Sequence, residues 1–351
     1  MKRMAAILVA TTLFATTTTI AARAVTVRLL SLPRHATIEP FAARALMAVA
    51  ADGTIAATLT VNGFVVRPIV WDRRGAYRLP NARGSIAGFD DANGLLINAG
   101  RPARLGAGTR VSAVDLASCE NFPQASTGPT LAGVLSNGAL IATMQSPAMV
   151  NLDDTSGQNA PVVLHLRSRQ CLNVGNGIAL ATAGLYAVGY VAYIANVPAP
   201  SNVVSRAERF TAMRWHERTR EPLGAGVAVA VNAAGAAAGA DVPPGNGAAY
   251  GVSAHARYWP GDGSVVEVAP ASPRSTAYAI DARNRIAGML EDAHGRHYAF
   301  LWQNGTLHRL DDVAAASGWR FECAYAFAPD GAIVGIGTYR GNAAAFEITG
   351  L

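Results

Sequence analysis

Lysine is almost absent from this chain of 351 residues, in which Lys2 is the only one. The other basic side chains are arginines, and they are spread along the sequence instead of being gathered in one segment. The formal net charge at pH 7 is a modest +6. Proteins that bind nucleic acid concentrate their basic side chains on one stripe or patch that neutralises phosphates. The composition therefore argues against nucleic acid as a partner.

The chain also lacks the short motifs that mark common active sites. It contains no Gly-x-Ser-x-Gly nucleophile elbow, no glycine-rich phosphate loop ahead of a helix, and no Cys-x-x-Cys pair. His294 and His297, beside Glu291 and Asp292, resemble a zinc motif at first sight. They fall in an expected hairpin loop, whereas a zinc site needs matched spacing and a further ligand. We therefore predict no bound metal and no cofactor.

Residues 1–24 have the parts of a secretory signal peptide. A charged start is followed by an apolar core at 5–15 and by a small-residue cleavage site that ends at Ala24. A threonine run at 16–19 makes the segment irregular, so an uncleaved membrane anchor is the alternative. We expect a secreted or periplasmic protein whose residues 25–351 form a single domain.

Two apolar stretches further along have about the length of a membrane span. Residues 178–197 contain no charged side chain, and residues 227–240 are rich in alanine and glycine. Gly184 and Gly189 interrupt the first stretch, and Asn232 interrupts the second. Pairs of buried strands around tight turns explain both stretches better. We predict no membrane insertion beyond the N-terminal segment.

A pair of large apolar residues recurs along the chain at a spacing of eight or nine positions. The pairs are Trp71/Leu79, Ile97/Leu105, Leu166/Val174, Trp215/Leu223, Trp259/Val268 and Trp302/Leu310. They repeat with a period of roughly 45 residues, which is typical of repeat folds.

Each repeat unit has the same order of segments. An apolar strand leads into a turn with Gly or Asn, which supply the positive φ of tight hairpins. A strand of small residues, a variable loop, a strand ending at the Trp position and a short fourth strand follow. The turn dipeptides are Asp52-Gly53, Asn137-Gly138, Ala183-Gly184, Ala234-Gly235, Arg283-Asn284 and Asp330-Gly331. This pattern predicts an all-β protein, a β-propeller of four-stranded antiparallel blades. We favour seven blades, with six as the alternative, and expect the Trp residues to pack between blades.

The two ends of the chain are expected to share the last blade. The last unit stops at Ile348 without a fourth strand, whereas residues 25–30 are an extended apolar stretch with no partner before it. This N-terminal stretch can supply the missing strand and close the ring, which removes exposed strand edges.

The clearest units resemble a known family. Residues 277–310 and 324–348 are similar to the HAF repeat of bacterial extracellular proteins, which reads roughly Ala-x-Ala-Ile-Asn-x-x-Gly-x-Val-Val-Gly and then His-Ala-Phe-x-Trp-x-x-Gly. Residues 298–305, Tyr-Ala-Phe-Leu-Trp-Gln-Asn-Gly, match the second half with Tyr in place of His. Asp281 and Asn284 replace the family's Asn and Gly. The resemblance implies export and a propeller-like repeat, and it brings no activity and no catalytic residues.

Three cysteines are too few for a disulfide framework. Cys119 and Cys171 fall in neighbouring repeat units and are the better candidates for a disulfide, while Cys323 lies in the last unit. Three free, buried thiols are the alternative.

Long loops are expected on one face of the ring, where second strands lead to third strands and blades lead to blades. The expected long segments are Gln145–Ala160, Ala195–Glu208, Ala240–His255 and the inter-blade stretch Gly106–Gly128. Long loops in a compact domain are often functional, so we predict that this face binds a ligand. The alternative is that surface loops tolerate insertions because the entropy of loop closure rises slowly with length.

The candidate binding residues on this face are polar or aromatic. They are Asn151, Asp153, Asp154, Asn159, Arg206, Tyr250 and His255. The Asn and Asp residues offer oxygen atoms without the regular spacing of a calcium loop. The aromatic rings suit contacts to a sugar or a peptide, and the arginine lies in a segment where Arg and Glu interleave, which is also typical of a solvated strand face.

These observations favour an exported, non-enzymatic protein that binds a protein or glycan through the loop-bearing face. The main alternative is a propeller hydrolase or lyase that acts on an extracellular polymer, with ionisable side chains from several blades gathered over the channel. A structural envelope or surface protein is the third possibility. The fold does not decide among them, and the oligomeric state stays open.

We expect the exported protein to begin at Val25, because cleavage after Ala24 follows the small-residue rule of signal peptidases. The check is the intact mass of protein recovered from the periplasm or medium of an export host. An Ala24→Arg variant should keep the N-terminal segment. Recovery of the unmutated chain at its full mass of 36.3 kDa would contradict the prediction.

Overall fold

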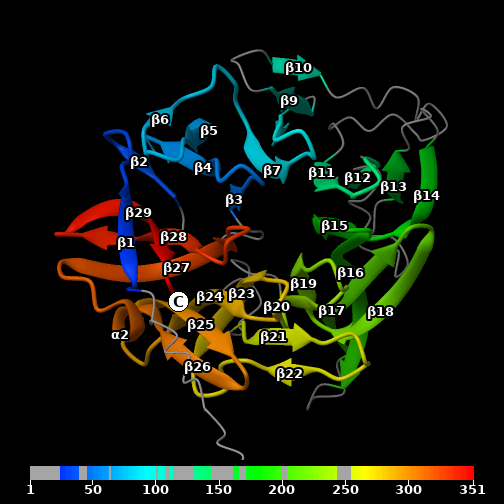
Figure 1. The fold of residues 1–351 in the computed structure, drawn as a ribbon. Helices are drawn as coiled ribbons and strands as arrows, with labels where there is room; N and C mark the ends of the chain where they lie inside the picture. Colours follow the sequence, from blue (N-terminus) through cyan, green and yellow to red (C-terminus); the bar gives the residue numbers. More distant parts are fainter. Residues whose placement is uncertain are drawn as a thin grey trace, which may run out of the picture.

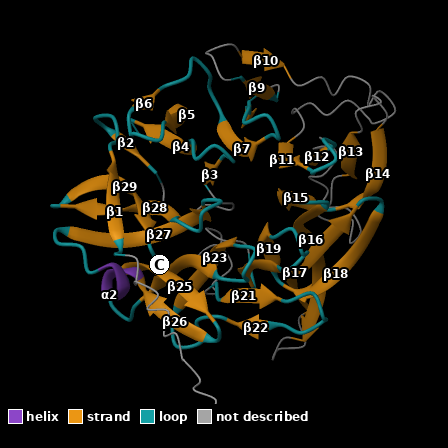
Figure 2. Cartoon of the chain, in the orientation of Figure 1, coloured by secondary structure: helices purple, strands orange, loops and turns teal. Residues whose placement is uncertain are grey.

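The computed structural model describes residues 24–38, 46–62, 65–99, 102–106, 111–113, 130–143, 161–165, 171–198, 204–242 and 254–351. These residues form seven antiparallel sheets arranged in a ring, and the colours of Figure 1 run once around it from blue to red. Figure 2 shows strand almost everywhere, with one short helix in the described part of the chain, α2 (Leu310–Ala314). The predicted seven-bladed propeller is confirmed, and the six-bladed alternative is wrong.

Each sheet is one blade, and the first strand of each blade lies closest to the axis (Figure 1). Blade 1 contains β3 (Met47–Val49), β4 (Ile55–Val61), β5 (Val65–Trp71) and β6 (Tyr77–Arg78). Blade 2 contains β7 (Ser85–Phe89), β8 (Leu95–Asn98), β9 (Ala103–Leu105) and β10 (Val111–Ala113). Blade 3 contains β11 (Thr130–Val134), β12 (Leu140–Thr143), β13 (Pro161–His165) and β14 (Cys171–Asn176).

The second half of the ring follows the same plan. Blade 4 contains β15 (Ile178–Ala183), β16 (Tyr186–Pro198), β17 (Val204–His216) and β18 (Thr219–Ala225). Blade 5 contains β19 (Val227–Val231), β20 (Ala237–Ala240), β21 (Ala256–Trp259) and β22 (Val266–Glu267). Blade 6 contains β23 (Arg274–Ile280), β24 (Ile286–Glu291), β25 (His297–Gln303) and β26 (Thr306–Arg309).

Blade 7 is built from both ends of the chain. Its inner strands are β27 (Trp319–Phe327), β28 (Ile333–Tyr339) and β29 (Asn342–Thr349), and its outer strand is β1 (Thr26–Leu30). The ladder places Thr26 opposite Thr349 and Leu30 opposite Ala345. The predicted closure by the N-terminal strand is confirmed. A short strand, β2 (Ala36–Thr37), lies between β1 and β3 in the chain and pairs with the far end of β4.

The two apolar stretches that have the length of a membrane span are pairs of strands. Residues 178–197 form β15 and most of β16, and residues 227–240 form β19 and β20. In the described residues, no helix has the length and apolar character needed to cross a membrane.

The turns between first and second strands follow the predicted dipeptides. Positive φ values occur at Gly53, Gly138, Gly184, Gly235, Asn284 and Gly331. In blade 6, Asp281 Oδ1 accepts hydrogen bonds from the amides of Arg283 and Arg285, both at 2.9 Å. A short side-chain acceptor at the start of the turn thus satisfies amides that the ladder leaves unpaired.

The Trp residues that mark the repeat are packing residues. Trp71, Trp215 and Trp259 are buried, and each lies on the third strand of its blade. Trp302 is half-buried and packs on Tyr258 of the neighbouring blade, with ring centroids 5.5 Å apart. The predicted packing between blades is seen here directly.

Three details of the predicted architecture are wrong. Ile97 lies on the second strand β8 and not at the Trp position of a third strand, because blade 2 has no Trp to set the register. The expected loop Ala195–Glu208 is mostly strand, since β16 and β17 continue as a long hairpin. The expected inter-blade stretch Gly106–Gly128 includes the fourth strand β10.

A buried arginine joins blade 6 to blade 7. Arg285 donates to Asp281 Oδ2 at 2.7 Å, to the Gly331 carbonyl at 2.9 Å and to the Leu351 carbonyl at 3.0 Å. Its guanidinium also lies 5.1 Å from the ring centre of Phe327. The Arg285 side chain is only 6% exposed, so these acceptors replace water almost completely.

Replacing Arg285 by Ala should therefore lower the free energy of unfolding by about 3 kcal/mol, because a largely buried carboxylate loses its cation. Urea denaturation of the mature protein measures the change. Arg283→Ala, in the same turn but exposed, is the control and should stay within about 0.5 kcal/mol. Equal effects of the two substitutions would contradict the assigned role of Arg285.

Candidate functional site

The ring has two faces with different connections. The loop face carries the connections from second to third strands and from blade to blade, and the turn face carries the tight turns. Of the seven candidate binding residues, five lie outside the described residues: Asn151, Asp153, Asp154, Asn159 and Tyr250. Arg206 lies on β17, where the backbone alone is described. Only His255 can be placed with its side chain, so the predicted grouping of these residues stays a prediction.

His255 lies at the base of the long connection between β20 and β21. Its amide donates to Asp241 Oδ1 at 2.8 Å, and its Nδ1 lies 4.0 Å from Glu267 Oε1. Nδ1 has no hydrogen-bond partner. Arg257 bridges the two carboxylates, 3.3 Å from Glu267 and 3.8 Å from Asp241. The contacts among these four residues hold the base of the connection in place. The His255 side chain is 31% exposed.

A groove of about 410 Å³ lies beside this base on the loop face, between blades 5 and 6. Its apolar lining comes mainly from Pro270, Pro273, Leu290 and Leu307, and its polar lining from Ser272, Glu291, Asp292 and Arg309. The connection from β22 to β23 forms one wall, and the connection from β24 to β25 forms the other. The sequence signal that marks the groove is the pair of prolines, Pro270 and Pro273, in the connection between blades 5 and 6.

Hydrogen bonds hold the charged edge of this groove in place. The Arg296 amide lowers the pKa of Asp292, and the His294 amide and the Tyr298 hydroxyl add to the effect. The Tyr298 hydroxyl donates to Asp292 Oδ2 at 3.1 Å, and Arg309 lies over the Tyr298 ring at 4.2 Å. The groove therefore presents a carboxylate and a guanidinium on either side of one tyrosine.

The His294 and His297 pair is part of the same connection. The His294 amide donates to Asp292 Oδ1, and His297 Nε2 lies 3.5 Å from Glu291 Oε2. Across the described ranges, no group of three or more His, Cys, Asp or Glu residues is placed to hold a metal ion.

The axial channel is lined by first strands from all seven blades and encloses about 310 Å³. Its described lining is mostly Ala, Gly, Val, Ile and Leu, with Thr182, Tyr278 and Tyr325, and it includes no Asp, Glu, His, Lys or Arg. The two tyrosine rings pack together with centroids 4.9 Å apart, and both residues are buried. This described part of the channel offers apolar contact and no acid or base.

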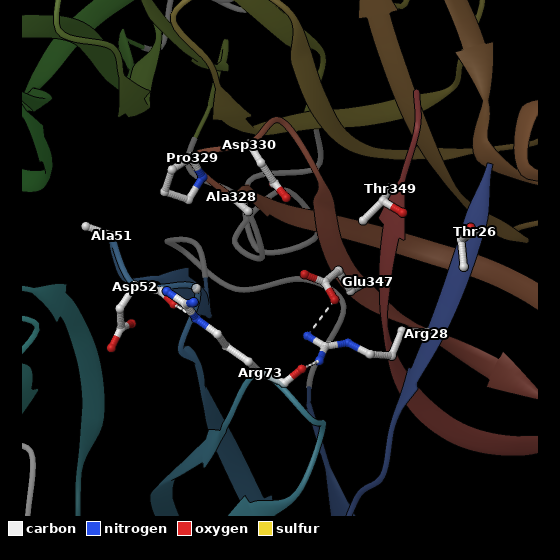
Figure 3. A pocket seen from close by; sticks show the side chains of 11 residues that line it. Thr26, Arg28, Ala51, Asp52, Arg73, Ala328, Pro329, Asp330, Glu347 and Thr349 are labelled. Carbon is white, nitrogen blue, oxygen red and sulfur yellow. Dashed lines mark hydrogen bonds and ion pairs between the residues drawn. The ribbon is translucent and has the colours of Figure 1, made fainter. Parts of the chain in front are cut away.

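A third hollow lies on the turn face, at the seam between blades 7 and 1, and we call it the seam pocket (Figure 3). Its volume is about 520 Å³. It is lined by Thr26, Arg28, Ala51, Asp52, Gly53, Arg73, Ala328, Pro329, Asp330, Glu347 and Thr349. These residues come from five separate segments, so no local motif marks the pocket in the sequence.

Ion pairs and hydrogen bonds cross the seam pocket. Arg28 Nη2 lies 2.5 Å from Glu347 Oε2, and the same guanidinium donates to the Arg73 carbonyl (Figure 3). Arg73 in turn donates to the Asp52 carbonyl. The Thr54 amide lowers the pKa of Asp52, and the charge of Arg73 adds to this.

The cysteines divide into two kinds. Cys171 is disulfide-bonded, and Cys323 is free and buried. Burial raises the pKa of the Cys323 thiol well above its usual range. Cys119 lies outside the described residues, so its pairing with Cys171 stays a prediction.

No family model and no curated protein matches this chain. Among solved structures, the β-propeller domain of the Trilobed protease from Pyrococcus furiosus, described as having an open velcro topology, aligns with a TM-score of 0.57 and 10% identity. The alignment covers 87% of this chain and 94% of that chain. At this identity the likeness supports the fold alone.

Two further solved structures are less similar. A chain of the mitotic checkpoint complex aligns with a TM-score of 0.45 and 13% identity over 99% of this chain and 98% of that chain. A puromycin-hydrolysing peptidase of Mycobacterium tuberculosis aligns with a TM-score of 0.39 and 12% identity over 83% of this chain and 57% of that chain. These likenesses carry no functional argument.

Thiol labelling should separate the two kinds of cysteine. The folded protein at pH 8 should react slowly or not at all, because the buried Cys323 thiol stays protonated. After denaturation without reductant one thiol should react, and after reduction all three should react. Peptide mapping of the unreduced protein should join Cys119 to Cys171. Three reactive thiols in the unreduced, denatured chain would contradict the disulfide.

Proposed function

We propose that this protein is exported and acts by binding, without catalysis, an extended segment of another protein in the groove between blades 5 and 6 on the loop face. The observation that carries the proposal is the groove itself, with its apolar floor and charged edge. Ligand sites in proteins are concave and mostly apolar, with a few fixed polar groups that orient the ligand.

The shape and lining of the groove favour a protein segment over a glycan. Pro270, Ala271 and Pro273 are exposed along one wall, and Leu290 and Leu307 contribute to the apolar lining. Sugar sites commonly use an open aromatic ring, whereas Arg309 covers the ring of Tyr298 here. A peptide with one apolar side chain can fill the floor and use Asp292 and Arg309 for its polar groups.

The lining of the axial channel also bears on the choice between binding and catalysis. A hydrolase or lyase at the channel mouth needs acidic or basic side chains from several blades. The described lining of the channel contributes apolar side chains and tyrosines from the first strands. This described part of the channel suits apolar contact with a ligand, and the propeller enzyme stays the alternative.

The base of the β20–β21 connection extends the proposed site. His255 and Glu267 lie on blade 5, and the Val268 amide donates to the Ala256 carbonyl, which joins this base to the wall of the groove. A ligand in the groove therefore lies beside the connection that follows Asp241. Export is supported by the signal-like residues 1–24, and membership of the HAF-repeat family stays a prediction.

A peptide and glycan array probed with the mature protein tests this function. Bound peptides should be followed by interferometry with two charge-matched variants, Ala271→Arg in the groove and Ala234→Arg on the turn face. Ala271→Arg should weaken binding about tenfold or more, because it places a charge in the centre of an apolar contact. Ala234→Arg should have no effect, since the neighbouring turn carries Arg283 at the same position.

Two outcomes contradict the proposal. Equal binding by both variants would show that the ligand binds outside the groove. Binding to glycans alone would show that the ligand is a sugar and not a protein. Deletion of residues 145–160 measures the separate contribution of the expected long loop on blade 3.

A further inference from the structure

The charged side chains that line the groove between blades 5 and 6 are not equally well paired. Glu291 Oε2 lies 3.7 Å from Arg274 Nη1 and 3.5 Å from His297 Nε2. Asp292 Oδ1 accepts hydrogen bonds from two amides of its own turn, at 2.8 and 3.0 Å. Asp292 Oδ2 accepts the Tyr298 hydroxyl, at 3.1 Å. Both carboxylates of the lining therefore have partners within the protein.

Arg309, the remaining charged residue of the lining, lacks such a partner. Its guanidinium carbon lies 4.2 Å from the centre of the Tyr298 ring. A ring attracts a cation but offers no oxygen acceptor. Asp311, two residues further along, accepts the Phe321 amide at 2.9 Å and lies too far from Arg309 for an ion pair. Among the residues that the structure describes, no carboxylate or carbonyl accepts a hydrogen bond from the Arg309 side chain.

The ring beneath Arg309 is itself held in place. The hydrogen bond from the Tyr298 hydroxyl to Asp292 fixes one end of the ring, and its other contacts lie in the core cluster between blades 5 and 6. An arginine that rests on a fixed ring loses less conformational freedom when it binds a further group. Its planar donors match a carboxylate, which they can bind through two parallel hydrogen bonds. The groove therefore presents one positioned cation whose donors are free for a ligand.

The spacing of the lining along β26 indicates what lies beside such a carboxylate. Leu307 and Arg309 are two residues apart on this strand, and both line the groove. The ladder places Leu307 opposite Trp302 and Arg309 opposite Phe300. Residues two apart on a strand share a face and are about 7 Å apart. An extended ligand has the same repeat, so it can place an apolar side chain at Leu307 and a carboxylate at Arg309.

We propose that the groove selects an extended protein segment in which an acidic residue stands two positions from an apolar residue, and that Arg309 binds the acidic side chain. The inference rests on the proposed function and adds the chemistry of the partner to it. The spacing favours an acidic side chain over the carboxylate at a chain end. That carboxylate is attached to the same Cα as the last side chain and lies closer to it than two residues of an extended chain do.

A nuclear magnetic resonance titration of the ¹⁵N-labelled mature protein at low ionic strength tests the proposal. The probes are the capped pentapeptides Gly-Leu-Ser-Glu-Gly and Gly-Glu-Ser-Leu-Gly, each also made with Gln or Lys in place of Glu. We expect a dissociation constant of about 1 mM for the Glu peptide in the better order. The Gln peptide should bind about fivefold more weakly, because it loses the ion pair, and the Lys peptide more weakly still. High salt should remove the preference for Glu, since it screens exposed charges.

Arg309→Gln and a matched control locate the interaction. The Arg309 Nε–H signal, identified by its absence from Arg309→Gln, should shift when the Glu peptide binds. Arg309→Gln should bind the Glu and Gln peptides equally. Arg340→Gln is the control, because Arg340 also lies over a tyrosine, 5.1 Å from the ring centre of Tyr339, and is outside the groove lining. Arg340→Gln should keep the full preference for Glu. If Arg309→Gln does not fold, the peptide series and its salt dependence still decide the question.

Several results would overturn the inference. They are the absence of binding by both Glu peptides, equal binding of the Glu and Gln peptides, tighter binding of the Lys peptide, and an unchanged preference in Arg309→Gln. Tighter binding of a capped Gly-Ser-Leu with a free terminal carboxylate would show that the groove selects a chain end instead.

Failure of the inference can be distinguished from failure of the proposed function. Peptides selected on the array that are weakened by Ala271→Arg, yet show no preference for an acidic residue, leave the proposed function standing and overturn the role of Arg309. Peptides that bind Ala271→Arg as well as the unmutated protein overturn both.

Discussion

The ladder between β1 and β29 is the interaction on which the rest of the ring depends. It joins the two ends of the chain, and Leu30 at its end is fully buried beside the hydrophobic core that includes Trp71. Without it, the outer edge of β29 would be an exposed template for pairing with other chains. The ladder is also the most non-local contact of the fold, so its formation must repay the entropy of closing nearly the whole chain. The seam pocket exists because this closure brings Arg28 to Glu347 and Arg73.

The crowding of seven first strands around one axis explains why small residues and glycine recur in the repeat. In six blades the ladder between first and second strand shifts its register at the same place, for example between Ala277 and Ala279 and between Ala324 and Ala326. The shift brings the first strand so close that a Cβ on Gly288 would lie 2.0 Å from the Thr276 carbonyl oxygen. A Cβ on Gly335 would lie 2.1 Å from the Cys323 carbonyl oxygen. In blades 6 and 7 the glycine that ends the small-residue phrase is therefore required by the β-bulge opposite it.

The repeat pattern does not predict the strand positions correctly where a blade lacks its Trp. Trp71, Trp215, Trp259 and Trp302 place four third strands correctly, because one large side chain must fill the gap between blades. Ile97 was assigned by its spacing to Leu105 alone, and it belongs to a second strand. An aliphatic residue suits the second and the third strand of a blade equally well, so its spacing to Leu105 does not indicate to which strand it belongs. The expected loop Ala195–Glu208 overlaps the segment where Arg and Glu interleave, and that pattern, which is typical of a solvated strand face, agrees with the strand β17 found there.

Local chemistry in the sequence determined the number of blades, the turns, the Trp packing and the strand that closes the ring. Each of these depends on residues close together in the chain or on a pattern repeated around it. The groove between blades 5 and 6, the paired tyrosines in the channel and the seam pocket were decided by tertiary structure alone. They arise where segments distant in sequence meet, as Arg28, Arg73 and Glu347 do at the seam pocket. A repeated residue pattern predicts the strands and turns within each blade. The hollows lie between blades, so they depend on how the side chains of two blades pack against each other.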